Sequence, residues 1–331
     1  MALRQQPLDS PFGARSTAAE VVQGVDLRHR TAIVTGASAG LGAETARALA
    51  SAGAHVILAV RSVAKGEAVA ARIRAALDRC AAGSGTVEVA GLDLSQWDSV
   101  RAFARGLLQR GAPIHLLVNN AGMMCADQQL IEGRIEAQFG VNHLAHMLLT
   151  ALLAPLLLAG APARVVALSS AAHRRLPAYF DDARILDLPY EKLQAYSISK
   201  TASALFALEL NRRLEAQGVT ALSVNPGPVF TGIQAAFSPE DMKALKFHDS
   251  EGRPAAWFNP VEVGAATSVW CAVSPLLAGN GGVYCEDCNV ATLRSADHDE
   301  LNGVRAWAAD PANARALWAL SESLLASGPL L

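Results

Sequence analysis

Short apolar runs alternate with longer stretches of helical character along most of this chain of 331 residues. Several of these runs, such as residues 33–34 and 116–118, are apolar throughout instead of alternating between apolar and polar positions. Such runs are typical of parallel strands that helices cover on both faces. Seven of them with helical crossovers predict one α/β domain on a doubly wound, parallel, seven-stranded sheet. We expect the strands at residues 31–35, 55–60, 86–92, 114–119, 164–169, 221–224 and 282–285.

One of the helices expected between these strands is unusually apolar. Residues 147–161 are almost wholly apolar, but Pro155 interrupts them, and Pro162 and Arg164 follow. A membrane-spanning helix needs about 20 apolar residues, so we expect a buried helix with a kinked or broken end and no integral membrane segment. Ser95 is the expected N-cap of another helix. The helices are predicted at residues 41–52, 63–80, 95–109, 134–158 and 196–214.

The composition is that of a globular protein, with 51% hydrophobic and 18% charged residues. Lysine and arginine number 28 and aspartate and glutamate 30, so the net charge is −2. This balance provides no basic surface for DNA or RNA, and nucleic acid is excluded as a default partner. The N-terminus is polar and lacks the apolar core of a signal peptide. We therefore expect a cytoplasmic protein.

The five cysteines are an odd number in a chain without a secretory signal, which favours reduced thiols over disulfides. Cys285 and Cys288 form a C-x-x-C pair, which suggests a zinc or redox site. A structural zinc needs four ligands, and no second pair stands at a fitting spacing. A thioredoxin-like pair begins a helix, whereas this one follows a predicted strand. We therefore expect packed or loop thiols and no metal site. The cysteines are Cys80, Cys125, Cys271, Cys285 and Cys288.

Three glycines follow the first strand directly, in the run Thr-Gly-Ala-Ser-Ala-Gly-Leu-Gly at residues 35–42, and a helix opens behind them. Glycine allows a positive φ and a close approach of the backbone to a ligand, and a helix N-terminus stabilises negative charge. The run therefore favours a pyrophosphate as ligand. The alternative is a glycine-rich turn that only packs the helix on the strand.

Tyr196 and Lys200 stand one turn apart on the same face of a predicted helix. Interconversion of an alcohol and a ketone needs a group that takes or gives the hydroxyl proton, and tyrosine alone is a weak base at neutral pH. An ammonium one turn away favours the phenolate, although such pairs are also common on helix surfaces. Ser170 ends an apolar strand where ligands bind in such sheets, and its hydroxyl can polarise a substrate oxygen. Ser169 is the alternative donor.

In their chain order, these motifs resemble those of the short-chain dehydrogenase/reductase family over roughly residues 20–290. Within the family the chain is similar to the retinol dehydrogenase and WW-domain oxidoreductase branch, through residues 18–27, 55–61 and 169–173. The resemblance implies a Rossmann-like fold and an oxidoreductase acting on CH–OH and C=O groups. The matching residues are the run at 35–42, Asp93, Asn119-Asn120-Ala121-Gly122, Asn142, Ser170, Tyr196, Lys200 and Asn225-Pro226-Gly227.

The resemblance also implies a role for each residue. Tyr196 would be the acid/base, Lys200 its electrostatic and ribose-binding partner, and Ser170 the donor to the substrate oxygen. Asn142 would hold a relay water beside the lysine. The residues expected to contact the cofactor are Thr35, Gly36, Ser38, Ala39, Gly40, Leu41, Gly42, Arg61, Asp93, Leu94, Asn119, Ala121, Gly122, Tyr196, Lys200, Pro226, Gly227, Val229 and Thr231.

The choice of cofactor depends on the end of the second strand. An acidic residue there usually holds the ribose hydroxyl of NAD(H), but this chain has Val60 and Arg61. Arg61 can pair with a 2′-phosphate and stack on adenine, with Lys65 nearby. We therefore expect NADP(H), with NAD(H) and a solvated Arg61 as the alternative.

Outside the motifs, one segment points to the substrate. Residues 230–260 match the family's substrate lid and are rich in aromatic residues, although these total only 5% of the chain. They predict a hydrophobic pocket for a steroid-, retinoid- or polyketide-like alcohol or ketone, with Met123 and Met124 as further walls. The alternative is ordinary packing of an amphipathic helix over residues 239–247. We divide the chain into an N-terminal arm (1–28), a dinucleotide-binding catalytic domain (29–290) and a C-terminal helical extension (291–331).

Residues 174–192, which separate Ser170 from Tyr196, match a loop inserted in the retinol-dehydrogenase-like branch. We expect Arg174, Arg175 and His173 to be solvated or structural rather than catalytic. Because the family commonly pairs subunits through its long helices, at residues 134–158 and 196–216, a homodimer or homotetramer is expected. Two other functions remain open, an NADPH-dependent carbon–carbon double-bond reductase and a cofactor-binding regulatory protein without turnover.

Overall fold

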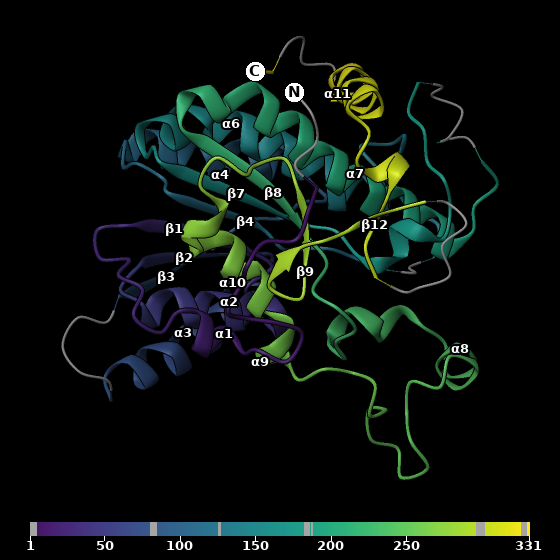
Figure 1. Ribbon diagram of the computed structural model, residues 1–331, viewed down its shortest axis with the longest axis horizontal. Helices are drawn as coiled ribbons and strands as arrows, with labels where there is room; N and C mark the ends of the chain where they lie inside the picture. The colour runs from purple at the N-terminus through teal and green to yellow at the C-terminus, as the bar shows by residue number, and fades with distance from the viewer. Residues whose placement is uncertain are drawn as a thin grey trace.

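An eight-stranded sheet forms the centre of the protein in a computed structural model, which describes residues 5–79, 85–124, 127–181, 186, 188–295, 302–325 and 330–331. The strand order is β10-β9-β8-β7-β4-β1-β2-β3 (Figure 1). Because the order reverses between β1 and β4, a crevice is expected at their carboxyl ends. The strands are β1 (Thr31–Thr35), β2 (His55–Val60), β3 (Thr86–Gly91), β4 (Leu116–Asn119), β7 (Ala163–Leu168), β8 (Val219–Val224), β9 (Tyr284–Glu286) and β10 (Asn289–Val290).

The doubly wound, parallel class predicted from the sequence is confirmed, and each of the seven predicted strands lies in the sheet. The predicted strand count is wrong by one, because β10 returns antiparallel to β9. Asp287 and Cys288, at φ 52° and 54°, form the two-residue turn between them, and such turns need a positive φ at both positions. Two residues are too few for an apolar pattern, and Asp-Cys is not the usual signal for this turn.

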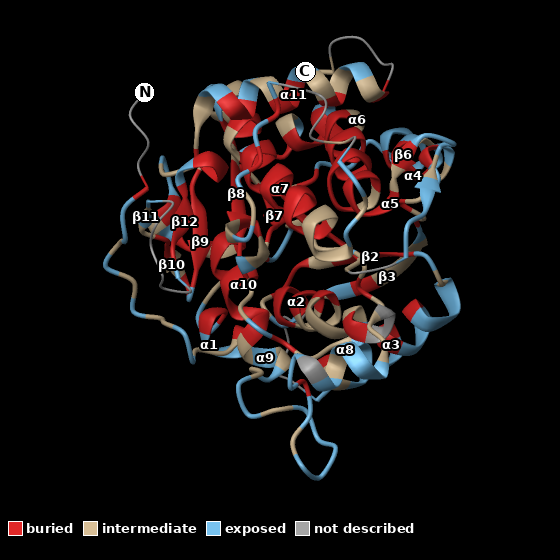
Figure 2. Ribbon diagram, turned by 90° about the vertical axis from the view of Figure 1, so that its right-hand side faces the viewer, coloured by how far each residue is buried: buried red, intermediate tan, exposed pale blue. Residues whose placement is uncertain are grey.

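Helices cover both faces of the sheet (Figures 1 and 2). Helices α4, α6, α7 and α11 pack on one face, and α1, α2, α3 and α10 on the other. In β1, Ile33 faces the first layer, whereas Ala32 and Val34 face the second. This double burial explains why the strand is apolar throughout. The helices are α1 (Ala18–Val21), α2 (Gly40–Ser51), α3 (Val63–Leu77), α4 (Trp97–Arg110), α5 (Ala137–Phe139), α6 (Ala145–Ala159), α7 (Lys192–Leu214), α8 (Pro239–Ala244), α9 (Val261–Gly264), α10 (Ala266–Val273) and α11 (Pro311–Leu325).

The helix predicted at residues 134–158 starts later than expected. Strands β5 (Leu130–Ile131) and β6 (Ile135–Glu136) form a small hairpin. Its turn includes Glu132 and Gly133 at φ 50° and 70°. The Glu136 carboxylate then accepts the backbone N–H groups of Gln138 and Phe139 and so caps the start of α5. The hairpin also caps the start of α4, because its Glu132 carboxylate accepts the N–H group of Trp97, the first residue of that helix. Ser95, the predicted cap of α4, bonds Asp93 instead.

The apolar helix itself is continuous with a π-helical turn at Gly140–Leu144 and runs through Pro155 to Ala159. Of the kinked or broken end predicted at this proline, the break is therefore wrong. Within the described part of the chain, the stretch Ala137–Ala159 is the one helix long and apolar enough to span a membrane. It is 72% buried inside the protein over its most apolar window, between the sheet and helices α4 and α7. This burial is that of a core helix.

The C-terminal extension contains strands as well as a helix. β11 (Leu293–Arg294) pairs in parallel with β12 (Val304–Arg305), and a short 3₁₀ turn leads into α11. In α11, Trp318 stacks on Phe206 of α7 with ring centres 6.1 Å apart, and the Arg213 guanidinium lies 4.3 Å from the Trp318 ring. The extension therefore covers part of the α7 face that we expected between subunits.

The N-terminal arm lies along the β9–β10 hairpin. The Gln5 side chain donates to the carbonyls of Tyr284 and Ala291 at 2.8 and 2.6 Å, and it accepts the Tyr284 N–H at 2.9 Å. Leu8 and Asn289 exchange two further hydrogen bonds between backbone and side-chain amide. The arm is thereby fixed to the edge of the sheet.

Candidate active site

Tyr196 and Lys200 lie where α7 crosses the carboxyl end of β7. Helix α7 begins there because the Glu191 carboxylate accepts the N–H groups of its first turn. Both side chains are buried, and the Lys200 Nζ donates to the Leu168 carbonyl at 2.9 Å and lies 5.6 Å from the centre of the Tyr196 ring. Burial lowers the pKa of Lys200 to about 8. The lysine thus still carries its charge at neutral pH beside the tyrosine.

The two candidate serines have different surroundings. Ser169 is buried, and its hydroxyl donates to the Lys200 carbonyl at 2.6 Å. Ser170 is only partly buried and begins the 3₁₀ turn Ala171–Arg174, where its hydroxyl oxygen accepts the Ala172 N–H at 3.1 Å. The Ser170 hydroxyl proton remains available to a substrate oxygen, whereas that of Ser169 is engaged.

Asn142, in the π-helical turn, joins the proton-transfer residues to the cofactor motif. Its Oδ1 accepts the Met123 N–H, and its Nδ2 donates to the Met123 carbonyl and to Ser199 Oγ. A Cβ on Gly122 would lie 3.1 Å from Asn142 Oδ1 and 3.5 Å from Lys200 Nζ. Gly122 therefore lies directly beside both catalytic candidates, with no room for a larger side chain. The Asn142 side-chain amide is therefore fully engaged, and its backbone carbonyl faces His146 Nδ1 at 3.1 Å and accepts the Ser203 hydroxyl at 3.4 Å.

The glycine run has the shape that a pyrophosphate requires. Gly36 and Gly40 have φ of 67° and 53°, and a Cβ on Gly36 would stand 2.9 Å from the Ala121 Cα. The N-cap of α2, Ala39, makes no side-chain capping bond, in contrast to the N-cap Ser62 of α3. The first N–H groups of α2 have no side-chain acceptor, which fits a phosphate ligand. Ser38 and Leu41 are partly exposed on the same loop, and Gly42 is buried beneath it.

Thr35 ties this loop to the neighbouring strand. Its hydroxyl oxygen accepts the N–H groups of Asn120 and Ala121, each at 2.9 Å, and lies 2.9 Å from His146 Nε2 and 3.4 Å from the Val118 carbonyl. His146 Nδ1 faces the Asn142 carbonyl and must donate to it, so Nε2 is the acceptor of the Thr35 proton. The Asn120 amide donates to the Thr35 carbonyl and so ties the ends of β4 and β1 together. Burial lowers the pKa of His146 to about 4 and keeps the ring neutral. We did not expect this histidine, although it follows Asn142 by one helical turn.

Other expected cofactor residues lie less directly at the loop. The Asn119 amide donates to Thr150 Oγ1 of α6 at 3.0 Å, so its backbone is left for a ribose contact. The Asp93 carboxylate accepts from Ser95 at 2.7 Å, and Leu94 beside it is buried. Arg61 is exposed at the end of β2. Asn119, Asp93 and Arg61 lie at the carboxyl ends of β4, β3 and β2. Because these strands lie at different positions in the sheet, the three residues are spread along its carboxyl edge.

The loop after β8 lies against the glycine run. Gly227 has φ 73°, and Pro226 before it is partly exposed. A Cβ on Gly40 would meet the Thr231 side chain at 3.2 Å, which places Thr231 beside the phosphate loop. Val229 is buried and lies, with Leu41, around Gly264 of α9.

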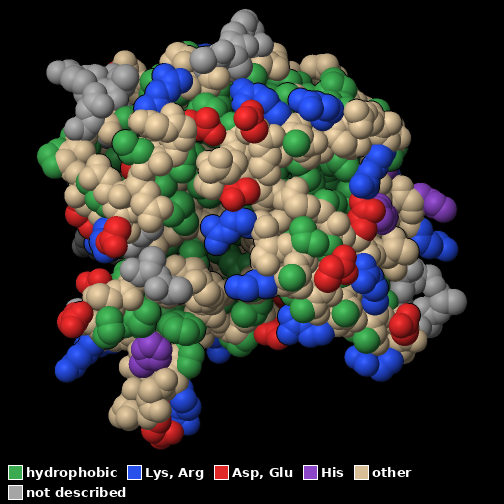
Figure 3. All heavy atoms as spheres, turned by 180° about the vertical axis from the view of Figure 1, so that it is seen from behind, with side chains coloured by type: hydrophobic (Ala, Val, Ile, Leu, Met, Phe, Trp, Pro, Cys, Tyr) green, Lys and Arg blue, Asp and Glu red, His purple; other side chains and the backbone are tan. Residues whose placement is uncertain are grey.

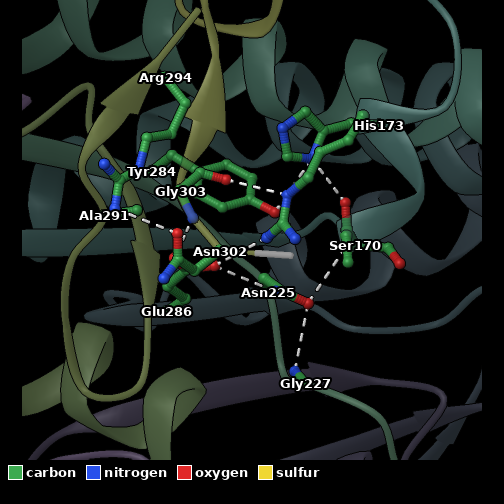
Figure 4. A network of polar contacts seen from close by, with 12 residues as sticks. Ser170, His173, Asn225, Gly227, Tyr284, Glu286, Ala291, Arg294, Asn302 and Gly303 are labelled. Carbon is green, nitrogen blue, oxygen red and sulfur yellow. Dashed lines mark hydrogen bonds and ion pairs between the residues drawn. The ribbon is translucent and has the colours of Figure 1, made fainter. Parts of the chain in front are cut away.

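A buried polar network supports this loop and the Ser170 turn (Figure 4). Asn225 Oδ1 accepts the N–H groups of Gly227 and Ala171, each at 3.2 Å, and Nδ2 donates to Glu286 at 3.3 Å. Glu286 also pairs with Arg174 at 3.0 Å, with side chains 11% and 7% exposed. Arg174 is therefore structural rather than solvated, whereas Arg175 is exposed.

Residues 230–260, the predicted substrate lid, form a lobe that projects from the body (Figure 1). A backbone bridge between Val229 and Asn259 joins the two ends of this lobe. Within it, Phe247 contacts Phe237, Trp257 and Phe258 at ring-centre distances of 5.2–5.9 Å. Helix α8 ends at Ala244, short of the predicted residue 247. Seen from behind, hydrophobic side chains gather at the base of the lobe, and charges of both signs are interleaved over the rest of that face (Figure 3).

Three cysteines, Cys271, Cys285 and Cys288, are buried free thiols. Burial raises the pKa of Cys288 to about 12 and that of Cys271 well above its usual range, so neither thiol forms a thiolate nucleophile at neutral pH. Cys80 and Cys125 lie outside the described residues. Within the described residues, no group of three His, Cys, Asp or Glu side chains is arranged to hold a metal ion.

Comparison with known proteins agrees with this geometry. The family model for short chain dehydrogenase matches residues 30–241. The chain is 39% identical to retinol dehydrogenase 11 of Homo sapiens over 86% of its own length and 85% of that protein. It is 36% identical to the WW domain-containing oxidoreductase of Gallus gallus, over 96% and 73% of the two chains. The Pseudomonas aeruginosa RhlG/NADP active-site complex is similar with a TM-score of 0.59 and 25% identity, over 79% and 95% of the chains.

Proposed function

The chain belongs to the short-chain dehydrogenase/reductase family and is an oxidoreductase, and from this premise we propose that it interconverts a hydrophobic secondary alcohol and ketone, or a primary alcohol and aldehyde, with NADP(H). The proposal rests mainly on the position of Gly122 directly beside Asn142 and Lys200. It brings the cofactor motif and the proton-transfer residues to one place. We propose the catalytic domain at residues 29–290 on the same basis.

When bound, the nicotinamide supplies or accepts the hydride at the substrate carbon. The Tyr196 hydroxyl gives a proton to the substrate oxygen during reduction and takes it back during oxidation. Ser170 donates a hydrogen bond to the same oxygen and lowers the barrier where negative charge develops. The Lys200 ammonium stabilises the phenolate, and a water held by Asn142 beside the lysine would return the proton.

Replacement of the tyrosine tests this mechanism. Tyr196→Phe is expected to lower kcat at least about 100-fold, with the dissociation constant for NADPH unchanged. Oxidation of NADPH with all-trans-retinal, a 3-ketosteroid, acetophenone and a matching enone measures turnover, and fluorescence titration measures binding. Tyr179→Phe is the control, because Tyr179 is exposed. Full turnover by Tyr196→Phe would refute the mechanism, and a preference for the enone would favour double-bond reduction.

The NADP(H) preference is proposed from Arg61, which is exposed at the end of β2 where no acidic residue holds the ribose. The relative solved with NADP supports it. Arg61→Asp is expected to raise the KM for NADPH at least about tenfold more than that for NADH. Arg72→Asp on the exposed side of α3 is the control for a change of charge. Equal effects on the two cofactors would contradict the assignment.

The hydrophobic substrate, the assembly and the location complete the proposal. The lid aromatics and the retinol dehydrogenase relative support an apolar substrate. We propose a homodimer or homotetramer whose interface leaves α11 in place on α7, and light scattering of the intact chain measures its mass. We also propose a cytoplasmic location, since the one described helix apolar enough to span a bilayer is largely buried. Cell fractionation tests this location.

A further inference from the structure

His173, in the 3₁₀ turn that follows Ser170, is fully buried beside the proposed active site (Figure 4). Its Nδ1 lies 2.7 Å from the Ser170 carbonyl oxygen and 3.2 Å from the Tyr284 hydroxyl. Its Nε2 lies 3.2 Å from the backbone nitrogen of Arg305 in β12. The ring therefore joins the backbone of the proposed catalytic serine to the C-terminal extension.

The partners of the ring determine which nitrogen carries the proton. The Arg305 N–H can only donate, so Nε2 must accept and be unprotonated. The proton therefore lies on Nδ1, where the Ser170 carbonyl at 2.7 Å is the nearest acceptor. Burial and the neighbouring Arg174 and Arg305 lower the pKa of His173 to about 3. The ring stays neutral, in one tautomer, across the range in which an enzyme of this family works.

The extension holds the residue from a second side as well. The Trp307 indole N–H donates to the His173 carbonyl at 3.0 Å, and Trp307 is itself buried. In the same network, the Arg174 Nε donates to the Gly303 carbonyl at 3.1 Å. Residues 303–307 thus make three hydrogen bonds with His173 and Arg174, although more than 130 residues separate Trp307 from His173.

We propose that His173 is a positioning residue for Ser170, and that the backbone of the C-terminal extension sets the tautomer in which it acts. The Nδ1–H bond to the Ser170 carbonyl orients the main chain that carries the serine hydroxyl toward the substrate oxygen. This inference rests on the role proposed for Ser170. It gives the extension a part in the chemistry, through one hydrogen bond at each ring nitrogen.

Two substitutions each remove one of the two hydrogen bonds that join the His173 ring to Ser170 and to Arg305. In His173→Asn, the side-chain Nδ2 can replace Nδ1–H as the donor to Ser170, but nothing accepts from Arg305. In His173→Gln, the longer amide can accept from Arg305 but loses the donor to Ser170. We expect kcat of the Asn variant within about threefold of the wild type and a loss of about 10- to 100-fold for Gln. The KM for NADPH should not change in either variant.

A double-variant cycle shows whether His173 acts through the serine. The fastest substrate of the panel is used with wild type, Ser170→Ala, His173→Gln and the double variant. We expect the double variant to match Ser170→Ala, because the histidine has nothing left to position. Losses that multiply would overturn the inference and leave the proposed function standing. No loss in Ser170→Ala alone would overturn both.

A spectroscopic measurement needs no substrate and no folded variant. Of the eight histidines in the sequence, His173 is assigned in ¹⁵N–¹H spectra of the wild-type ring nitrogens by backbone-to-ring correlation. The expected spectrum is that of a neutral Nδ1–H ring from pH 6 to pH 8. An Nε2–H tautomer, or titration within this range, would overturn the inference.

Discussion

The lid and the C-terminal extension both contain large aromatic side chains, but these side chains are held in opposite ways. In the lid, aromatic rings contact mainly one another, and Trp257 is 47% exposed. In the extension, Trp307 and Trp318 are 4% and 2% exposed and pack on the catalytic turn and on α7. We therefore expect substitutions in the lid to leave the fold intact and matched substitutions in the extension to destabilise it.

Their ion pairs differ in the same sense. Arg174 of the Ser170 turn and Glu286 of β9 have side chains 7% and 11% exposed, and both bond the backbone of Gly303 in the extension, whose carbonyl accepts from Arg174 and whose N–H donates to Glu286. Arg253 and Asp249 in the lid are 67% and 31% exposed. Removing one partner of a buried pair leaves an uncompensated charge, whereas exposed pairs contribute little. Matched substitutions in the two regions therefore test the difference directly.

The largest effect is expected at Trp318. Trp318→Ala removes a buried ring that stacks on Phe206 and lies under Arg213, so the free energy of unfolding should fall by about 3–5 kcal/mol. Urea unfolding followed by circular dichroism measures it. A loss below about 1 kcal/mol would mean that α11 is docked on the fold without contributing to it.

Glu286→Gln should cost somewhat less. The glutamine still accepts the Gly303 N–H, but it leaves the buried Arg174 without its counter-charge, and we expect a loss of about 2–4 kcal/mol. The same unfolding experiment gives the value. If Glu286→Gln proves neutral, the network joining the extension to the Ser170 turn is weaker than its burial indicates.

Lys200 is a buried charge in the proposed site, outside both regions, and its substitution should raise stability. Its pKa falls on folding from 10.5 to about 8, so the unfolded chain binds more protons between pH 8 and pH 10.5, and the free energy of unfolding rises with pH there. Lys200→Met is expected to stabilise the cofactor-free protein by about 1–3 kcal/mol at pH 7, to give no gain above pH 10.5, and to abolish turnover. Unfolding at both pH values checks the sign, and destabilisation at pH 7 would contradict it.

The lid counterpart of Trp318 is Trp257, which is the same residue type in an exposed position. Trp257→Ala should lower the free energy of unfolding by less than about 1 kcal/mol, while the KM for an apolar substrate rises and that for NADPH does not. Steady-state kinetics with retinal and NADPH separate the two constants. A loss of stability as large as that of Trp318→Ala would remove the distinction between the regions.

The smallest effect is expected from Asp249→Asn, the lid counterpart of Glu286→Gln. Both partners of the Asp249–Arg253 pair reach water, with Arg253 67% and Asp249 31% exposed, so the change in the free energy of unfolding should stay within about 0.5 kcal/mol. Unfolding in urea at low and high salt measures it. A larger, salt-sensitive loss would show that the lobe depends on this pair.

The parts of the fold that follow local patterns were predictable. The apolar runs located the parallel strands, and the one-turn spacing of Tyr196 and Lys200 placed them on one face, because periodicity and spacing act within a few residues. The eighth strand and the hairpin before α5 escaped prediction, since two-residue strands carry no periodicity. The contacts of His173 with Arg305 and of Arg174 with Glu286 span 132 and 112 residues, and nothing local to either partner signals the other.

The arm that lies along β9 and β10 has a consequence for how copies of this chain can meet. A bare edge strand invites pairing with a strand of another molecule. At one edge of the sheet, Leu8 and Asn289 already bond each other. At the other edge, the Arg74 guanidinium donates to the Val87 carbonyl of β3. Because groups at both edges of the sheet are already hydrogen-bonded within the chain, pairing of edge strands between molecules is disfavoured. Copies of the chain are therefore expected to associate through their helical layers.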